Sequence, residues 1–328
     1  MNLSIDKIKK RAVLINRIRN FFFESDFLEV DTPLLSPHLI PESSIENFKA
    51  SLISPYRDDI PLYLTPSPEI WMKQLLAQGS GDIFQICKSF RNNEQISPVH
   101  NPEFTMLEWY KTGITADENI RICELLISSI CLPETPDSCR PPFRQMTVEE
   151  AFIEFAGFSL EENMEIPTLL KQLQLAGIPA EENEGWEVLY HKLFLTLVEP
   201  ELPCDRPLVL KNYPRRLATL AADIEESPWS DRWELYMDGT EIANCYTEET
   251  DIEKIRNYYE KEGQKKSLNS RVPVRISSSW VKGMKDFPSC SGTAIGVDRL
   301  TAALIGDKSI QGVILFPLDA ILPEAKNS

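Results

Sequence analysis

The sequence predicts an α+β domain, in which an antiparallel sheet is flanked by helices and carries a small helical insertion. Helical and strand-like segments follow one another as helix, strands, a long helical stretch, strands and a terminal helix. No strand leads into a GxGxxG or GxxxxGK[ST] loop, which disfavours a doubly wound parallel sheet. The 328 residues, 42% hydrophobic and 26% charged, are in the range of a soluble globular chain.

The N-terminal third predicts a helix, a short strand and a second helix. Apolar residues at three- and four-residue steps over residues 5–22 indicate an amphipathic helix. Residues 27–33 resemble a strand that a proline ends. Ser67-Pro68-Glu69 supplies a cap residue, a first-turn proline and an acid at the start of a helix over 70–78, which Gly79 closes.

The middle of the chain predicts two paired strands followed by an insertion. Residues 83–91 and 104–110 are strand-like, and the polar loop between them indicates antiparallel neighbours. A proline-rich linker over 133–142 precedes a helical segment over 147–197, which begins with a capping-box pattern at Thr147. We therefore expect a helical insertion at about 145–200.

The C-terminal third returns to strand character. Residues 232–246 are strand-like and 251–262 are helical. Residues 291–304 form a glycine-bearing strand-to-helix turn. This return to strands after the insertion completes the predicted α+β order.

Composition disfavours several classes of function. A net charge of −16 and a pI near 4.8 oppose tight non-specific binding to nucleic acid. The seven cysteines contain no CxxC pair, and the three histidines (His38, His100, His191) show no pattern of a metal centre or a catalytic triad. No apolar run approaches the roughly 20 residues of a membrane span, so we expect a cytoplasmic protein.

Residues 90–94 and 100–110 form the first group that could perform chemistry. On a strand, Phe104, Met106, Glu108 and Tyr110 share one face, and the residues between them share the other. A face with an aromatic ring, a carboxylate and a phenol is unlike a core face. Taken alone, the pattern also fits an edge strand with a solvated glutamate, and Arg91 fits a surface cation.

Residues 239–248 supply a second group. Glu241 and Glu248 lie seven positions apart, on opposite faces of an uninterrupted strand, so their joint use needs a bulge or a strand end between them. Alone, they also fit two solvated acids in a very acidic protein, and Ser67-Pro68-Glu69 also fits a simple helix cap.

The run FRNNE (90–94) followed by HNPEFTMLEWY (100–110) resembles motif 2 of class II aminoacyl-tRNA synthetases of the lysyl type. Residues 27–33 resemble motif 1 of that family, and residues 292–299 resemble motif 3, in the order that the family requires. The resemblance covers essentially the whole chain. It implies one class II synthetase catalytic domain over residues 1–328, ATP and Mg²⁺ as cofactors, and a homodimer formed through motif 1.

The same resemblance implies an ATP site with two catalytic arginines. Arg91 would hold the α-phosphate, Arg299 the γ-phosphate, and Phe104 would stack under adenine. Asn93 and Glu94 compete for one role in the motif 2 loop. The remaining ATP-binding residues implied are Asn92, Asn101, Glu241, Ile242 and Gly296, and Glu241 and Glu248 are implied as Mg²⁺ ligands.

The implied amino acid site is rich in carboxylates. Its residues are Ser67, Pro68, Glu69, Glu108, Tyr110, Asn244, Glu248 and Ala294. Three carboxylates and a phenol suit a dicationic amino acid, because a buried ammonium group is costly without paired acids.

The position of motif 1 indicates which branch of the family the chain resembles. It begins within ~30 residues of Met1, which leaves no room for the anticodon-binding domain of lysyl-tRNA synthetase. The chain instead resembles stand-alone paralogues that attach β-lysine to a lysine of elongation factor P. Ala294 stands where lysyl-tRNA synthetases have glycine, whereas Cys245 stands where these paralogues have glycine.

The sequence is compatible with three activities. The first is activation of (R)-β-lysine or lysine as an adenylate and its transfer to elongation factor P. The second is a truncated lysyl-tRNA synthetase-like enzyme that uses tRNA or another amine acceptor. The third is a catalytically silent amino-acid sensor.

Overall fold

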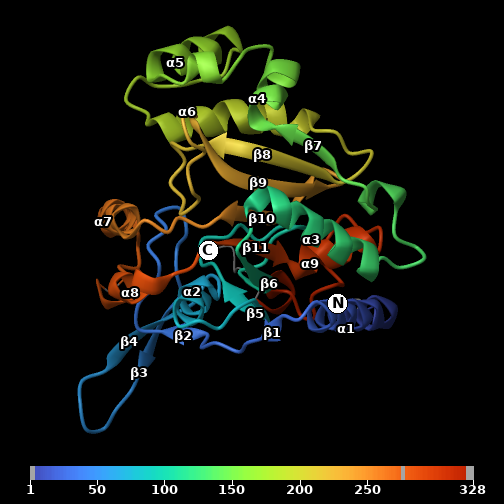
Figure 1. Ribbon diagram of the computed structural model, residues 1–328, viewed down its shortest axis with the longest axis vertical. Helices are drawn as coiled ribbons and strands as arrows, with labels where there is room; N and C mark the ends of the chain where they lie inside the picture. Colours follow the sequence, from blue (N-terminus) through green and yellow to red (C-terminus); the bar gives the residue numbers. More distant parts are fainter. Residues whose placement is uncertain (1–3, 275–277, 323–328) are drawn as a thin grey trace, which may run out of the picture.

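Eight strands form one sheet in the order β1-β5-β6-β11-β10-β9-β8-β7 (Figure 1). The computed structural model describes residues 4–274 and 278–322, so the predicted domain of residues 1–328 extends beyond the described ranges at both ends. The strands are β1 (Leu28–Glu29), β5 (Ile83–Phe90), β6 (Glu103–Thr112), β7 (Arg144–Thr147), β8 (Leu208–Pro214), β9 (Trp229–Met237), β10 (Thr240–Thr247) and β11 (Cys290–Gly296).

The predicted α+β class and the antiparallel pairing of β5 with β6 are confirmed, but the pair at each edge of the sheet is parallel. β1 pairs parallel with β5, and β7 pairs parallel with β8. Parallel neighbours need a long crossover connection, and in both places the chain supplies one. The crossover from β1 contains a small sheet and a helix, and the crossover from β7 is the helical insertion.

The predicted alternation along β6 is confirmed. Leu107 and Trp109 are fully buried in the largest hydrophobic core, whereas Glu108 and Tyr110 on the other face line a cavity. Three helices cover the core face: α1 (Ile5–Glu24), α3 (Ala116–Ile130) and α9 (Val297–Leu304). The helix predicted over 5–22 is thus present, and the sequence analysis did not identify α3.

The opposite face carries α2 (Glu69–Ala77), and a small sheet lies in the same crossover. Pro68 is itself the N-cap of α2 and no side chain caps the helix, so the prediction that Ser67 caps it is wrong. The small sheet consists of β2 (Leu35–Ser36), β3 (Lys49–Leu52) and β4 (Ile60–Leu64), and the β3–β4 hairpin projects from the lower end of the molecule (Figure 1). Three further α-helices follow the hairpin of β9 and β10 or lie near the C-terminus: α7 (Ile252–Asn269), α8 (Ser278–Gly283) and α10 (Leu318–Ile321).

The predicted helical segment over 147–197 contains three α-helices joined by turns and lies at the upper end of the molecule (Figure 1). They are α4 (Val148–Ala151), α5 (Ile166–Leu175) and α6 (Trp186–Leu193), and a π-helical turn follows both α4 and α6. The capping box is confirmed, since Thr147 Oγ1 accepts from the Glu150 amide at 3.1 Å and Glu150 accepts from the Thr147 amide at 2.7 Å. The segment has a hydrophobic core of its own against β8 and β9.

The strand predicted over 232–246 is a hairpin of two strands. β9 and β10 are joined by Asp238 and Gly239, which both have positive φ angles of 48° and 74°. This Asp-Gly pair is typical of a two-residue hairpin turn. The turn makes β9 and β10 neighbours, so that both can line one site.

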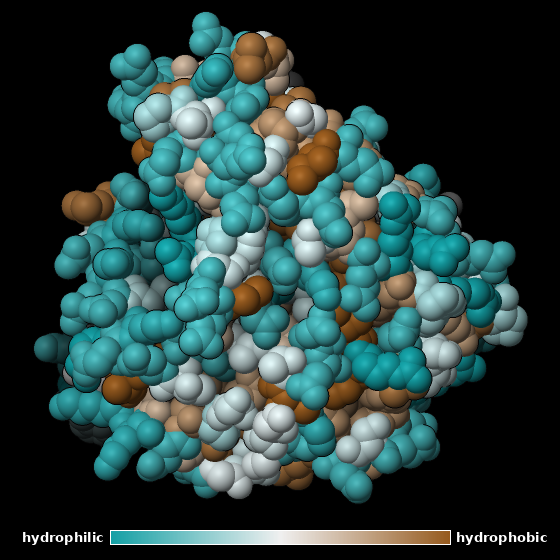
Figure 2. Space-filling model, turned by 45° about the horizontal axis from the view of Figure 1, so that its top comes forward, coloured by the Kyte–Doolittle hydropathy of each residue, from teal (hydrophilic) through white to brown (hydrophobic). Residues whose placement is uncertain are grey.

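Figure 2 shows mainly hydrophilic residues with scattered apolar patches on the face in view. Within residues 4–274 and 278–322, no helix is both long and apolar enough to cross a membrane.

Candidate active site

Two adjoining cavities form one cleft on the sheet face opposite α1 and α3. The larger cavity has a volume of about 330 Å³, and the smaller one, which we call the acidic pocket, has about 100 Å³. They share Glu42, Ile45, Arg91, Met106, Asn244 and Ala294. A ligand can therefore extend from one cavity into the other.

Arg91 enters the cleft from the end of β5. Its backbone amide donates to the Pro102 carbonyl at 2.9 Å, which closes the loop between β5 and β6. Its guanidinium lies over the Phe104 ring, 5.3 Å from the centroid. The buried Arg91 Nε has no hydrogen-bond partner among the described residues, so this donor is free for an anionic ligand.

Arg299 enters the same larger cavity from the first turn of α9. Its Nε donates to the Val99 carbonyl at 3.0 Å, and its Nη1 donates to the Glu241 carbonyl at 3.1 Å. The preceding Asp298 is buried and accepts from Arg11 at 2.9 Å and from the Thr105 amide at 2.7 Å. These contacts fix the start of α9 and hence the direction of Arg299.

The structure brings most of the predicted nucleotide residues together. Besides the two arginines, the larger cavity is lined by Glu94, Asn101, Phe104, Glu241, Ile242 and Gly296. The amide of Asn101 has a structural role as well, since its Nδ2 donates to the Glu103 carbonyl at 2.6 Å and its Oδ1 accepts from the Leu318 amide at 2.9 Å. Two cations, a stacking ring and an open volume suit a nucleotide polyphosphate.

Two predicted nucleotide residues lie outside this cavity. Asn92 and Asn93 are exposed and line none of the cavities, and Asn92 Nδ2 donates to the Asn47 carbonyl at 3.2 Å. Glu94 lies in the cavity wall, with its Oε1 3.3 Å from His100 Nε2. Of the two competing residues, the geometry therefore favours Glu94.

The acidic pocket gathers the predicted substrate residues. Ser67, Glu69, Glu108, Tyr110, Asn244, Glu248 and Ala294 all line it, whereas Pro68 does not. Tyr110 donates its hydroxyl proton to Glu108 Oε1 at 2.7 Å. Glu108, Tyr110 and Glu248 are buried, so the pocket gathers acidic side chains away from water.

A buried lysine that the sequence analysis missed connects two of these carboxylates. Lys73 is only 2% exposed, and its Nζ lies 2.5 Å from Glu69 Oε1 and 2.6 Å from Glu248 Oε2. The spacing of Glu69 and Lys73, four residues apart on a helix, was the available signal. Lys73 neutralises part of the pocket, and Glu108 stays free of any direct cation among the described residues.

Gly292 on β11 lets Tyr110 and Glu248 approach each other. It is paired with Tyr110 in the sheet. A methyl group at this position would lie 2.5 Å from Tyr110 Cε1 and 2.6 Å from Glu248 Oε1. The site therefore needs a residue without a side chain at position 292.

Burial controls the charge state of the pocket. Burial raises the pKa of Glu108 to about 8, and the Glu69 carboxylate adds to the shift. Burial also raises the pKa of Glu248 to about 8, although the Lys73 ammonium opposes the shift. The shift favours a protonated Glu108 in the empty pocket and a Glu108 carboxylate when a cation binds, whereas Glu248 is held in an ion pair by the Lys73 ammonium.

These shifts predict that the KM for a cationic amino acid falls as pH rises from 6.5 to 8.5. The raised pKa of Glu108 favours its neutral form at the lower pH, and a neutral carboxyl cannot balance an ammonium. For each proton that the enzyme releases when the amino acid binds, KM falls by up to about tenfold per pH unit. The fall levels off once the pH exceeds the pKa of the carboxyl group. Kinetics over this range would measure it. Glu108→Gln should flatten the slope, and a KM independent of pH would contradict the expectation.

The two acids proposed as metal ligands occupy different parts of the cleft. The register of β10 shifts between Glu241 and Ala243, and Glu248 follows the end of the strand, so the condition that a bulge or a strand end separates the two acids is met. Glu241 lines the larger cavity, but Glu248 lines the acidic pocket and pairs with Lys73. The geometry thus favours Glu241 alone on the nucleotide side.

Comparison with protein families agrees with this geometry. The family model described as tRNA synthetases class II (D, K and N) matches residues 3–320. The chain belongs to this class II synthetase family. Its eight-stranded sheet, with Arg91 directly after β5 and Arg299 on α9, is consequently part of a class II synthetase domain.

Curated relatives within the class II synthetases are similar over nearly the whole chain. Proteins named "Elongation factor P--(R)-beta-lysine ligase" from Buchnera aphidicola subsp. Acyrthosiphon pisum and from Vibrio atlanticus are each 34% identical, covering 96% of this chain and 96% of the relative. One from Klebsiella pneumoniae subsp. pneumoniae is 33% identical with the same coverage. The chain is thus an amino acid ligase of the class II synthetase type.

Proposed function

We propose that the chain activates (R)-β-lysine or lysine with ATP as an adenylate and transfers it to a lysine side chain of elongation factor P. One observation carries the proposal. Arg91 and Arg299 line a single cavity that continues into a pocket containing Glu69, Glu108 and Glu248. A triphosphate and a diamino acid would meet where the two cavities share Arg91 and Asn244.

Activation would need positioning and charge neutralisation and no protein nucleophile. An oxygen of the amino acid carboxylate attacks the α-phosphorus of ATP, a new O–P bond forms, and the bond to the β-phosphate breaks with loss of pyrophosphate. The free Nε of Arg91 would stabilise charge that develops at the α-phosphate. Arg299, fixed by its bonds to two carbonyls, would hold the other end of the triphosphate.

The residues present fit a magnesium ion only together with the nucleotide. Within the described ranges no group of three or more His, Cys, Asp or Glu side chains could hold a metal. Mg²⁺ commonly takes one or two carboxylates plus phosphate oxygens, and Glu241 at the larger cavity could supply one. A bound ion would neutralise phosphate charge. We do not retain Glu248 as a ligand, because it pairs with Lys73.

Ala294 is the proposed determinant of amino acid choice. It lines both cavities and is paired with Glu108 across β6 and β11. We expect Ala294→Gly to shift the ratio of kcat/KM values for (R)-β-lysine and lysine toward lysine, by about tenfold, since one methyl group is worth ~1 to 3 kcal/mol of discrimination. Exchange kinetics with both amino acids would measure this. An unchanged ratio would remove Ala294 from the explanation.

The acceptor is proposed from the names of the relatives, which specify elongation factor P. The decisive experiment has two parts: ATP–pyrophosphate exchange with (R)-β-lysine and with lysine, and intact mass of purified elongation factor P after incubation with enzyme, ATP and the amino acid. Exchange together with a mass gain of one aminoacyl group supports the proposal. No exchange with either amino acid would refute the activation step, and charging of total tRNA in place of the factor would refute the acceptor.

Assembly and location also stay proposals. We propose a homodimer through the face near β1, where Phe23 and Leu28 are 52% and 55% exposed although both are apolar. Light scattering at several concentrations would reveal the mass. We further propose a cytoplasmic enzyme, since its reaction consumes ATP, and one that makes no contact with a tRNA anticodon.

A further inference from the structure

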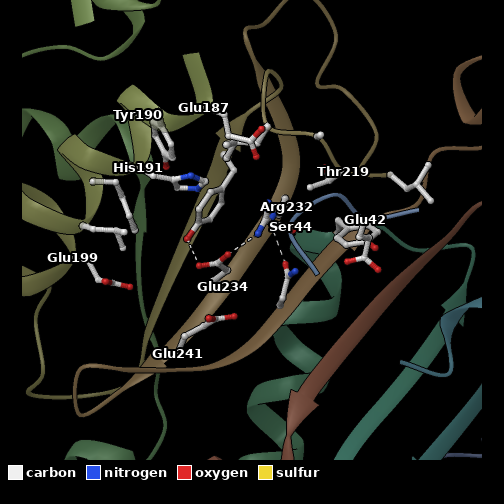
Figure 3. Close-up of a pocket in the computed structure, with 18 of the residues that line it drawn as sticks. Glu42, Ser44, Glu187, Tyr190, His191, Glu199, Thr219, Arg232, Glu234 and Glu241 are labelled. Atoms are coloured by element: carbon white, nitrogen blue, oxygen red, sulfur yellow. Dashed lines mark hydrogen bonds and ion pairs between the residues drawn. The ribbon is translucent and has the colours of Figure 1, made fainter. Parts of the chain in front are cut away.

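A third cavity, which we call the side cavity, lies between the helical insertion and the sheet (Figure 3). Its volume is about 370 Å³. Helix α6 and the turn after it contribute Glu187, Tyr190, His191 and Glu199, and strands β8 to β10 supply the opposite wall. None of these four residues lines the larger cavity or the acidic pocket.

The side cavity adjoins the active-site cleft. Glu42 and Asn244 line all three cavities. The side cavity also shares Glu69 with the acidic pocket and Glu241 with the larger cavity. The three cavities therefore meet beside the point at which the amino acid carboxylate and the nucleotide would react.

Its lining favours a cation. Arg232 is the only lysine or arginine among the lining residues, and its Nη2 lies 2.6 Å from Glu234, which leaves it no free charge (Figure 3). Burial lowers the pKa of His191, so this ring adds little positive charge at pH 7. Glu187 and Glu199 supply two further carboxyl groups, and no lysine or arginine pairs with either among the described residues; burial raises the pKa of Glu199, so Glu187 is the more acidic of the two. Such a wall attracts a positively charged group.

One buried hydroxyl in the wall lacks a partner. Tyr190 is 1% exposed, and its hydroxyl makes no hydrogen bond to any described residue. Its ring is stacked between Trp186 and Phe194, with centroid distances of 5.3 and 5.7 Å, so the hydroxyl is held in place. An unsatisfied buried hydroxyl costs stability, and a ligand with a hydrogen-bonding group would recover it.

We propose that the side cavity receives the acceptor's lysine side chain and delivers its amine to the adenylate at the junction beside Glu42. This inference rests on the proposed function and adds a route and residues to it. The acidic wall guides the ammonium group, and the helical insertion thereby becomes part of the acceptor site. The larger cavity and the acidic pocket stay occupied by the adenylate during the transfer.

The transfer step needs a neutral amine. The amine nitrogen attacks the carbonyl carbon of the adenylate, a C–N bond forms, and the C–O bond to the phosphate breaks so that AMP leaves with the electron pair. The ammonium loses two protons in all; Glu42 accepts the first, and the second passes to water. Burial raises the pKa of Glu42 to about 7, with Glu69 adding to the shift, and this makes it a stronger base than an ordinary carboxylate.

The test separates adenylate formation from transfer. Glu187→Lys places a positive charge in the wall of the side cavity. Glu154→Lys makes the same charge change at an exposed position of the insertion that lines none of the three cavities. For each variant we would measure ATP–pyrophosphate exchange, trapping of the adenylate by hydroxylamine, and labelling of purified elongation factor P. Hydroxylamine is small and uncharged, so it does not require the acidic wall.

Glu187→Lys is expected to leave exchange and hydroxamate formation within about twofold of wild type and to lower kcat/KM for the protein acceptor by about tenfold or more. Glu154→Lys should match wild type in all three assays. Tyr190→Phe, a conservative change, should lower transfer by about fivefold, the value of one neutral hydrogen bond, without altering exchange.

Two results would overturn the inference: wild-type transfer by Glu187→Lys, or a parallel loss of exchange and transfer in Tyr190→Phe at an unchanged melting temperature. Absence of exchange in the wild-type enzyme would instead refute the proposed function itself. The two failures are thus distinguishable.

Discussion

Replacing Arg91 with alanine is expected to lower the rate of ATP–pyrophosphate exchange by about 10²–10³-fold, the usual loss when one fixed donor to a transition-state charge is removed. Its guanidinium lies over the Phe104 ring, and its Nε has no hydrogen-bond partner among the described residues. The fold therefore positions the group and leaves this donor available. The folded state should lose little stability, because no described side chain depends on this donor. Exchange kinetics and a melting curve would measure both quantities.

Arg121→Ala is the matched control for this change. Arg121 lies on α3, its side chain is 70% exposed, and its one ion pair is with Glu124 at 3.1 Å. The Arg121→Ala enzyme should catalyse ATP–pyrophosphate exchange at the wild-type rate. Arg299→Ala should lose activity like Arg91→Ala but also melt earlier, since Arg299 donates to two carbonyl oxygens. Wild-type exchange in Arg91→Ala would remove this residue from the proposed site.

Gly292→Ala is expected to raise the KM for the amino acid by on the order of 10²–10³-fold, the scale of the penalty for disrupting a buried charged pair. The added methyl group would lie within 2.6 Å of both the Tyr110 ring and the Glu248 carboxylate. Both side chains would have to move, and they line the acidic pocket. The KM for ATP should change far less, because Gly292 does not line the larger cavity.

Gly283→Ala provides the same chemical change without a clash. No described heavy atom lies within 4 Å of a methyl group at Gly283, and its φ of −67° suits alanine. Equal effects of the two substitutions would show that the loss is unrelated to the pocket. Similar KM values for Gly292→Ala and wild type would show that Tyr110 and Glu248 do not bind the substrate.

Local patterns predicted those parts of the fold in which one face of an element is buried. The alternation along β6 placed Trp109 in the core and Glu108 in the cleft, because strand side chains alternate between faces. The pairing of β7 with β8 could not be found in this way. This pairing joins residues more than 60 positions apart, with the helical insertion between them. In the sequence, the short strand β7 cannot be told apart from the helical segment that follows it directly.

The site could be predicted where a residue type was informative and missed where it was not. Arg91, Arg299 and Glu248 are charged residues within family motifs, and the structure brings all three into one cleft. Lys73 was missed because a lysine on a helix is usually a solvated residue, and only tertiary packing shows that it lies between Glu69 and Glu248. The side cavity was missed because its wall comes from separate segments of the chain.

The helical insertion resembles an accessory module in the sequence, but it shares a sheet with the rest of the protein. Along β8, Val209 belongs to the central core, whereas Leu208 and Leu210 on the other face belong to the core of the insertion. Excising the three helices would leave that second strand face bare to water. A shortened protein would consequently aggregate or unfold, and removing β8 and β9 as well would open the central core, to which Val209 and Trp233 belong.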